Sequence, residues 1–356
     1  MKSPSINAKA IIAERMRRQG LAEPLRTAHR YADLFRRLQP VSTVALTRPG
    51  DPPRLVHRTD FNDGRVADRM RARRQIVKGR FLGTNISYVL AEDLELYANA
   101  FSRSIAEPTP SVEKVLECVQ TTGPLTARQI KEETGLLSKR IMPALHKLQK
   151  AFLVYEDQVD SEWDRAWYDF AAEWPEIEVS EDKRLESTIT VLERFLKAHV
   201  FANREQFKDW SQLSVKTLTE ALDTMETQDL ITPCSIKGLG EGWTLTNDKF
   251  PTNAKPKKSV FMLHRADFLV RSHARELKRR FDGAEVLQYL LIDGELCGAV
   301  LGHWRFGPYD VDDILLDLPK KTREGRRDAI IEAVTAEYCL PRHRVLKYDG
   351  KKVKQS

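Results

Sequence analysis

The side chains whose chemistry stands out in this sequence are the arginines of its N-terminal quarter. Residues 1–88 hold 19 lysines and arginines against 7 acidic residues, a net charge of +12, whereas the whole chain has a net charge of +7. The planar guanidinium group suits phosphate oxygens. The alternative interpretation is an ordinary solvated surface, on which such an excess of positive over negative charge is uncommon. We therefore expect contacts with the backbone of double-stranded DNA, for which the candidates are Arg36, Arg37, Arg48, Arg54, Arg58, Arg80, Lys139, Arg140 and Arg305.

The cysteines and histidines do not indicate a metal site. Cys118, Cys234, Cys297 and Cys339 lie far apart without a C-x-x-C pair, and the eight histidines form no ligand-spaced cluster with them. The sequence contains no run of 18 apolar residues, and its opening lacks the apolar core of a signal peptide. We therefore expect no metal, no cofactor and no membrane segment, in a protein of the reducing cytoplasm.

An internal repeat organises the middle of the chain. Residues 129–153 realign without a gap on residues 206–230, and six residues recur identically at an offset of 77: Gln129/Gln206, Lys131/Lys208, Lys139/Lys216, Ala144/Ala221, Leu145/Leu222 and Leu153/Leu230. Each copy predicts a helix, a short polar turn, an amphipathic helix and an apolar stretch, which is the order of a winged helix-turn-helix. Such units most often bind nucleic acid, although many only hold proteins together.

The remaining patterns predict an α+β fold in which tandem winged helix-turn-helix units precede a small β-barrel. Residues 8–18 have helical spacing, and Pro24 is expected to open a second helix that runs to Leu38. Asp293-Gly294 joins two apolar strand patterns into a hairpin. The predicted domains are a basic winged-helix-like domain (1–107), two winged helices (111–180 and 185–250), a barrel-like domain (258–345) and a mobile basic tail (346–356).

The two repeats differ in charge. In the first, Lys139 lies opposite the apolar face of its helix and is free to meet phosphates, whereas the wing at residues 155–170 is acidic and should avoid DNA or meet another part of the protein. In the second repeat, the equivalent helix carries Glu220, Asp223 and Glu226. A helix with this charge reads a DNA groove poorly, so we expect the second unit to be scaffold.

Several segments occur in a recognisable order. These are LQPVS (38–42), VKGRFLGT (77–84) followed by YVLAEDLELY, REQFKDWSQL (204–213) and LLIDGELCGAVLGHWR (290–305). Over nearly the whole chain this order resembles the AlkZ-like (YcaQ) winged-helix DNA glycosylases, and Phe207–Ser211 is similar to the D-F-x-x-W-S of that family. The resemblance implies three tandem winged helices and a β-barrel around duplex DNA, and excision of N7-alkylated purines, including those that tether interstrand crosslinks. It also implies a monomer of the bacterial nucleoid.

The same resemblance implies a catalytic residue. The family carries two polar side chains two residues apart, Gln-x-Gln or Gln-x-Asp; Gln39 matches the first, and Val41 replaces the second. An N7-alkylpurine is already a cationic leaving group, so a glutamine needs only to orient water and steady the charge that develops on the sugar. Ser42, Asp60 and Asp63 are alternatives for the missing polar group, and no spacing selects among them.

Two classes of function follow. The first is a DNA glycosylase that uses Gln39. The second, favoured by Val41, is a non-catalytic winged-helix protein that recognises DNA damage or regulates transcription. A protein-interaction scaffold without a DNA role is a third class, which the basic N-terminal quarter disfavours.

Overall fold

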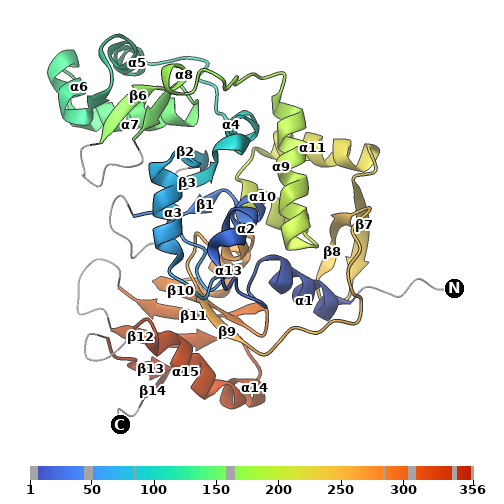
Figure 1. The fold of residues 1–356 in the computed structure, drawn as a ribbon. Helices are drawn as coiled ribbons and strands as arrows, with labels where there is room; N and C mark the ends of the chain where they lie inside the picture. The colour runs from blue at the N-terminus through green and yellow to red at the C-terminus, as the bar shows by residue number, and fades with distance from the viewer. Residues whose placement is uncertain are drawn as a thin grey trace.

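The computed structural model describes residues 7–43, 51–83, 85–157, 165–283, 285–303, 310–338 and 343–353. Helices and strands are mixed along the chain. The N-terminal strands lie at the centre of the molecule, with the first repeat on one side of them, the second repeat beside α2 and α4, and the C-terminal strands at the opposite end from the first repeat (Figure 1). In the part of the chain that is described, none of the helices is both long and apolar enough to cross a membrane.

The N-terminal part is a small sheet framed by helices. Its elements are α1 (Ala8–Arg18), η1 (Ala28–Arg30), α2 (Tyr31–Leu38), β1 (Val41–Ser42), α3 (Asp63–Ala72), β2 (Ile76–Leu82), β3 (Asn85–Leu90), η2 (Ala91–Asp93) and α4 (Leu94–Phe101). The helix expected to open at Pro24 begins only at Tyr31. Leu25 is extended instead, because its backbone exchanges hydrogen bonds with the loop at Arg58 and Asp60.

The repeat predicted from the sequence is confirmed by the element boundaries. In the first copy these are α6 (Ala127–Thr134), α7 (Ser138–Lys150) and β5 (Val154–Glu156); in the second they are α10 (Arg204–Ser211), α11 (Val215–Thr227) and β7 (Ile231–Ile236). Both helices begin and end at an offset of 77. The capping box of α6, made by Thr126 and Gln129, recurs on α10 as Asn203 and Gln206. The same local hydrogen bonds therefore set both helix starts.

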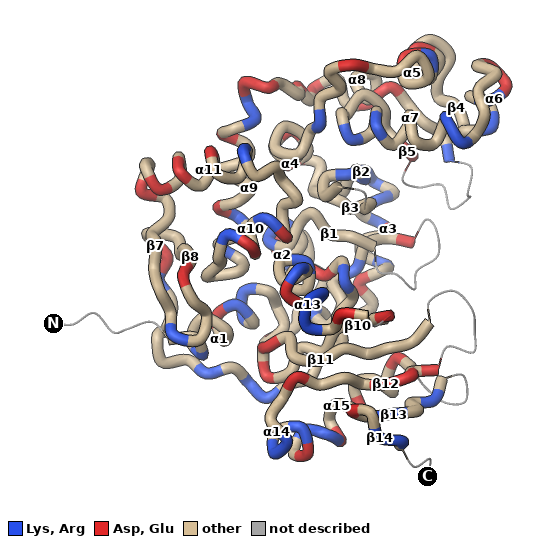
Figure 2. The backbone as a smooth tube through the Cα atoms, turned by 180° about the vertical axis from the view of Figure 1, so that it is seen from behind, with Lys and Arg blue, Asp and Glu red and all other residues tan. Residues whose placement is uncertain are grey.

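Further elements complete the two copies. The first also has α5 (Pro110–Thr122), β4 (Leu125–Thr126), β6 (Ala166–Asp169) and α8 (Phe170–Glu173), and the second has α9 (Arg184–His199) and β8 (Gly240–Leu245). In the first copy β6 pairs with both β4 and β5, and in the second β7 pairs with β8. Figure 2 shows the acidic residues of α11 along an outer edge of the molecule.

The acidic wing of the first repeat contacts the N-terminal sheet. The Glu156 carboxylate accepts hydrogen bonds from Lys78 of β2 at 2.9 Å and from Arg165 at 2.9 Å. Lys78 is 5% exposed, and burial lowers its pKa to about 8. The expectation that this wing meets another part of the protein is thus confirmed at Glu156. The ion pair fixes the first repeat against β2.

The C-terminal part is a sheet covered on both faces. Its elements are β9 (Val260–Leu263), α12 (Phe268–Ser272), α13 (Ala274–Arg280), β10 (Val286–Ile292), β11 (Glu295–Gly302), β12 (Val311–Leu316), α14 (Lys320–Gly325), α15 (Arg327–Thr335), β13 (Lys347–Tyr348) and β14 (Lys351–Lys352). The predicted hairpin is confirmed: β10 pairs with β11, and Asp293 and Gly294 both have positive φ. Within the described residues, the sheet runs in the order β12-β11-β10-β9 and does not close into the expected barrel.

The end of the chain differs from the expected mobile tail. Residues 347–352 form the β13–β14 hairpin, and Tyr348 is 8% exposed. It packs in the same apolar cluster as Val334 of α15 and Leu290 of β10. An aromatic side chain in a basic segment therefore anchors that segment to the C-terminal core.

A buried histidine joins three parts of the molecule. His199, at the end of α9, has no exposed surface, and its Nε2 lies 2.9 Å from Ser272 Oγ of α12. Arg15 of α1 donates to the His199 carbonyl at 2.8 Å. Burial and the Arg15 charge hold the pKa of His199 well below its usual 6.5, and burial lowers the pKa of nearby His273 to about 4. Both rings are thus neutral in the folded protein near pH 6.

We predict that stability falls as the pH drops from about 6.5 towards 4. In this window the unfolded chain takes up protons at His199 and His273 whereas the folded chain does not, so each histidine lowers the free energy of unfolding by up to about 1.4 kcal/mol per pH unit. Carboxylates whose pKa is lowered by ion pairs, such as Glu156, act in the same direction only below about pH 4.5. Urea unfolding at several pH values measures the slope. His199→Phe should reduce it and exposed His29→Asn should not; an unchanged slope in His199→Phe contradicts the assignment.

Candidate functional site

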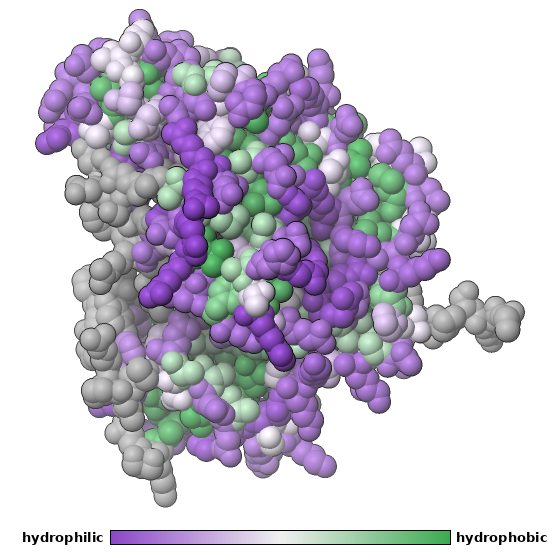
Figure 3. Space-filling model, viewed as in Figure 1, coloured by the Kyte–Doolittle hydropathy of each residue, from purple (hydrophilic) through white to green (hydrophobic). Residues whose placement is uncertain are grey.

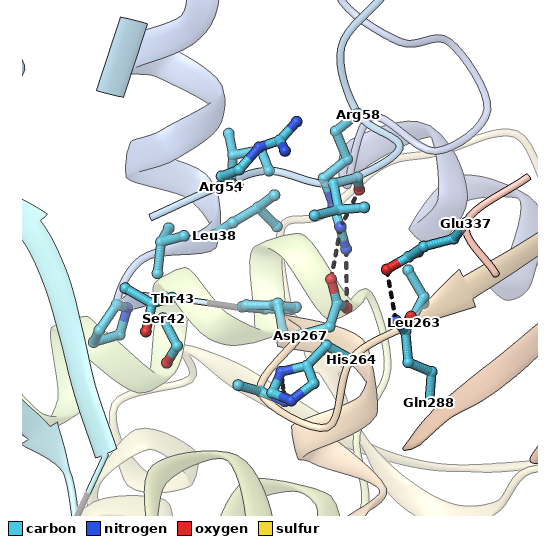
Figure 4. Close-up of a pocket in the computed structure, with 16 residues that line it drawn as sticks. Leu38, Ser42, Thr43, Arg54, Arg58, Leu263, His264, Asp267, Gln288 and Glu337 are labelled. Carbon is cyan, nitrogen blue, oxygen red and sulfur yellow. Dashed lines mark hydrogen bonds and ion pairs between the residues drawn. The ribbon is translucent and has the colours of Figure 1, made fainter. Parts of the chain in front are cut away.

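A cavity of about 280 Å³ opens between the end of α2 and the C-terminal part (Figure 4). Residues 38, 40–43, 54–56 and 58 form its N-terminal wall, and residues 263, 264 and 266–268 with Gln288 and Glu337 form the other. Leu38, Pro40, Val41, Leu263 and Phe268 make much of the lining apolar. The cavity therefore joins segments that are more than 200 residues apart in the sequence.

A buried ion pair crosses between the two walls. Arg58 is 1% exposed, and its guanidinium donates to the two carboxylate oxygens of Asp267 at 2.7 and 3.1 Å. Asp267 also accepts from the Leu269 amide and caps the start of α12. The guanidinium expected to contact DNA is thus turned into the protein, and this geometry gives Arg58 a structural role at the cavity wall.

Arg54 lies at the rim of the same cavity. Its side chain is 42% exposed, and its Nε donates to Asp63 at 3.0 Å. Asp63 has no exposed surface and also accepts from the Leu55 amide at 2.6 Å. Three residues are alternatives for the polar group missing at position 41. Asp63 is engaged in positioning this loop, and Asp60 is exposed and does not line the cavity. Of the three, only Ser42 lies on the cavity wall.

Two further polar groups come from the C-terminal part. Gln288 of β10 donates to Glu337 Oε1 at 3.0 Å. His264 Nδ1 accepts from the Ala266 amide at 3.2 Å, and burial lowers the pKa of this histidine to about 4. His264 is therefore neutral at physiological pH. Local sequence patterns do not single out these residues or Asp267, because the fold alone brings them to residues 38–58.

Gln39 points away from the cavity that its neighbours line. Its side chain is 1% exposed; its Nε2 donates to Asp93 Oδ2 at 2.7 Å, and its Oε1 accepts from the Leu90 amide at 2.8 Å. Asp93 also binds Arg194 at 2.8 Å and Arg36 at 3.3 Å. Both ends of the Gln39 amide are thus used in fixing α2 and β1 to β3 and η2. A catalytic role for Gln39 stays a prediction, and this geometry indicates a positioning role.

The other predicted DNA contacts occupy different environments. Arg36 pairs with Glu92 as well as Asp93; Arg37 donates to the Arg18 carbonyl at 2.7 Å; Arg80 donates to Gln149 at 2.7 Å. Lys139 and Arg140 are exposed at the start of α7. Arg48 and Arg305 lie outside the described residues. Only Lys139 and Arg140 of this set are exposed without an ion pair among the residues that the structure describes.

A basic row on α3 is missing from the predicted contacts. Arg65, Arg69 and Arg73 are exposed, and no ion pair within the described ranges holds them. Arg65 and Arg69 lie in α3 and Arg73 is its C-cap residue, and their spacing of four residues places them on one side of the helix. This spacing is visible in the sequence and is the signal that separates them from Arg71, which is 6% exposed and pairs with Asp68. Figure 3 shows long hydrophilic side chains over the region of α3.

The comparison with known families shows to which protein family the chain belongs. The model of the AlkZ-like DNA glycosylases matches residues 22–301. The chain belongs to this family. Among solved structures, the DNA glycosylase AlkZ of Streptomyces sahachiroi is similar, with a TM-score of 0.68 and 17% sequence identity over 98% of this chain and 100% of that chain, which shows a shared fold. No curated protein matches the sequence. Membership in the AlkZ-like family supports a function of the DNA glycosylase type.

We predict that Gln39→Ala destabilises the protein. The substitution leaves the Leu90 amide and the Asp93 carboxylate without their buried partner, and we expect a loss of about 2–4 kcal/mol in the free energy of unfolding. Urea unfolding measures this loss, and Gln120→Ala, at an exposed glutamine, should change it by less than about 0.5 kcal/mol. A Gln39→Ala protein that is as stable as the parent but releases bases about 10² to 10³ times more slowly would return Gln39 to a catalytic role.

Proposed function

We propose that this protein is a DNA glycosylase that hydrolyses the N-glycosidic bond of N7-alkylated purines in duplex DNA, including those that tether interstrand crosslinks. The observation that carries the proposal is the position of residues 38–42. In a chain of the AlkZ-like family, the neighbours of Gln39 in this segment line one wall of a cavity that has apolar and polar side chains. The cavity is large enough to hold a purine.

The chemistry requires little from the protein. The alkylated base leaves as a neutral molecule once the glycosidic bond breaks, so general acid catalysis is unnecessary and the site has only to place water and stabilise the positive charge on the sugar. Val41 supplies no polar group, and the Gln39 amide is engaged elsewhere. Besides the two arginines and the aspartate that are held in ion pairs, the polar side chains on the cavity wall are those of Ser42, Thr43, His264, Gln288 and Glu337.

The exposed arginines of α3 supply the surface for the DNA backbone. Arg65, Arg69 and Arg73 present three guanidinium groups to solvent, and Arg36 and Arg54 remain partly exposed beside their carboxylates. α3 contacts β2, and β2 in turn contacts α7, which carries Lys139 and Arg140 at its start. We assign this basic surface to the phosphates of the duplex and α11, with its acidic outer side, to scaffold.

The finer description of the fold is part of the same proposal. We interpret residues 1–107, 111–180 and 185–250 as three winged-helix units and residues 258–345 as a barrel-related unit whose sheet is open. We further propose that the protein acts as a monomer, without metal or cofactor, at the bacterial nucleoid in the cytoplasm.

A second candidate function is binding of damaged DNA without catalysis. It is favoured by Val41 at the second motif position and by the two hydrogen bonds that hold the Gln39 amide away from the cavity. The two functions share the DNA surface and differ in whether the base is released.

We predict that the purified protein releases N7-methylguanine from duplex DNA. Free base is quantified by chromatography, and abasic sites are revealed by alkaline cleavage of the strand. The matched substrate is the same duplex with unmodified guanine, from which no release is expected, because neutral guanine is a far poorer leaving group. Tight binding of the methylated duplex without release would support the non-catalytic function instead.

We also predict that the α3 arginines dominate backbone binding. With roughly six phosphate contacts, affinity for any duplex should fall about a thousandfold between about 50 and 200 mM salt. Replacing Arg65, Arg69 and Arg73 together by alanine should reduce the slope of log affinity against log salt by about 3, since each phosphate contact contributes about 0.9. Lys320→Ala with Lys321→Ala, at exposed residues of α14, is the matched control. An unchanged slope in the triple variant would place the DNA elsewhere.

A further inference from the structure

Among the charged side chains that line the cavity, one has no ion pair within the described residues. Arg58 is neutralised by Asp267 and Arg54 by Asp63. His264 is neutral, because burial lowers its pKa to about 4. Glu337 accepts a hydrogen bond from the uncharged Gln288 and has no ion pair among the residues that the structure describes. The cavity therefore has an unbalanced negative charge on its wall.

The C-terminal core holds Glu337 in this place. It follows α15, whose Ile330 and Val334 are fully buried in the core. The next residue, Tyr338, is 3% exposed and donates its amide to the Val334 carbonyl at 2.9 Å. Gln288 is 6% exposed on β10, and its amide nitrogen fixes Oε1 of Glu337. The carboxylate is thus restrained from two sides, although Glu337 itself is exposed.

The surroundings of this charge favour a cation. Glu337 and Gln288 lie on the opposite side of the cavity from Ser42 and Thr43 (Figure 4). The lining also includes the apolar side chains of Leu38, Val41 and Leu263. A base that fills the cavity displaces water from the side of the Glu337 carboxylate that faces the apolar walls, so the two charges interact more strongly there than they would in bulk water. The same walls accept the flat faces of an aromatic ring.

We propose that the cavity receives the positively charged base of an N7-alkylated purine and that Glu337 recognises its charge. This inference rests on the proposed function and adds a specificity-determining residue to it. Methylation at N7 enlarges the purine edge by one methyl group but adds a full positive charge, so a carboxylate that has no ion pair among the described residues distinguishes damaged from normal purine. Neutral purines fill the same space without this interaction.

The test compares two probes that differ in charge alone. One duplex carries 2′-fluoro-N7-methylguanine, whose glycosidic bond resists hydrolysis, and the other carries 7-methyl-7-deazaguanine on the same 2′-fluoro sugar, a neutral base of the same shape. We expect the parent protein to bind the cationic duplex about five to ten times more tightly. Glu337→Gln preserves the size of the side chain and should bring this ratio close to one, with little change in affinity for the neutral duplex.

Glu332→Gln is the matched control, because it removes an exposed carboxylate of α15 that does not line the cavity. It should keep the ratio of the parent. A ratio of one in the parent, or a ratio that Glu337→Gln leaves unchanged, overturns the proposal even if the parent releases N7-methylguanine. If the ratio depends on Glu337 and the parent releases no base, charge recognition stands and the glycosylase function fails.

Discussion

The buried pair of Arg58 and Asp267 is the contact on which the cavity depends. It joins residues 209 positions apart, and both groups also bind backbone: Arg58 donates to the Val56 carbonyl, and Asp267 caps α12. A buried ion pair contributes little net stability, because desolvation of the two charges offsets most of their attraction, yet removal of one partner leaves a buried charge and costs about 3–5 kcal/mol. The main effect of the pair is thus to fix the positions of the two cavity walls. It fixes the loop at residues 54–58 against residues 263–268, and the space between these segments is the candidate site.

Arginine has two different roles in this chain, one in buried pairs and one on the surface. Arg15, Arg18, Arg58 and Arg71 are all at most 6% exposed, and they bind carbonyls or carboxylates inside the molecule. The net charge of the N-terminal quarter therefore overstates its charge towards DNA. The row Arg65, Arg69 and Arg73 has the opposite character, because its spacing keeps all three side chains on the outer side of α3.

Local patterns in the sequence predicted local structure well. The repeat at an offset of 77 gave matching starts for α6 and α10 because each start depends on a capping residue and a glutamine three positions later. Asp293-Gly294 gave the hairpin because both residues tolerate positive φ. The helix expected from Pro24 failed for the opposite reason: backbone pairing of Leu25 with residues 58–60 is a long-range contact that no local pattern reveals. The open sheet and the two hydrogen-bond partners of Gln39, which lie 51 and 54 residues away, likewise depend on long-range contacts.

The environment of Gln39 and Val41 also connects the fold to the chemistry of the cavity. In β1, Val41 lies opposite Tyr88 of β3, and the Gln39 amide bonds to Leu90 at the end of that strand. A side chain that fixes a strand in this way cannot also turn to a ligand without breaking two buried hydrogen bonds, which costs about 1–3 kcal/mol for each group left unpaired. With Gln39 fixed and Val41 apolar, the polar groups of the N-terminal wall are two hydroxyls and two ion-paired arginines. The lining carboxylate that has no ion pair among the described residues faces this wall from the C-terminal part. Electrostatic selectivity in this family member then depends on how the C-terminal sheet is placed against residues 38–42. The ion pair between Arg58 and Asp267 fixes that placement.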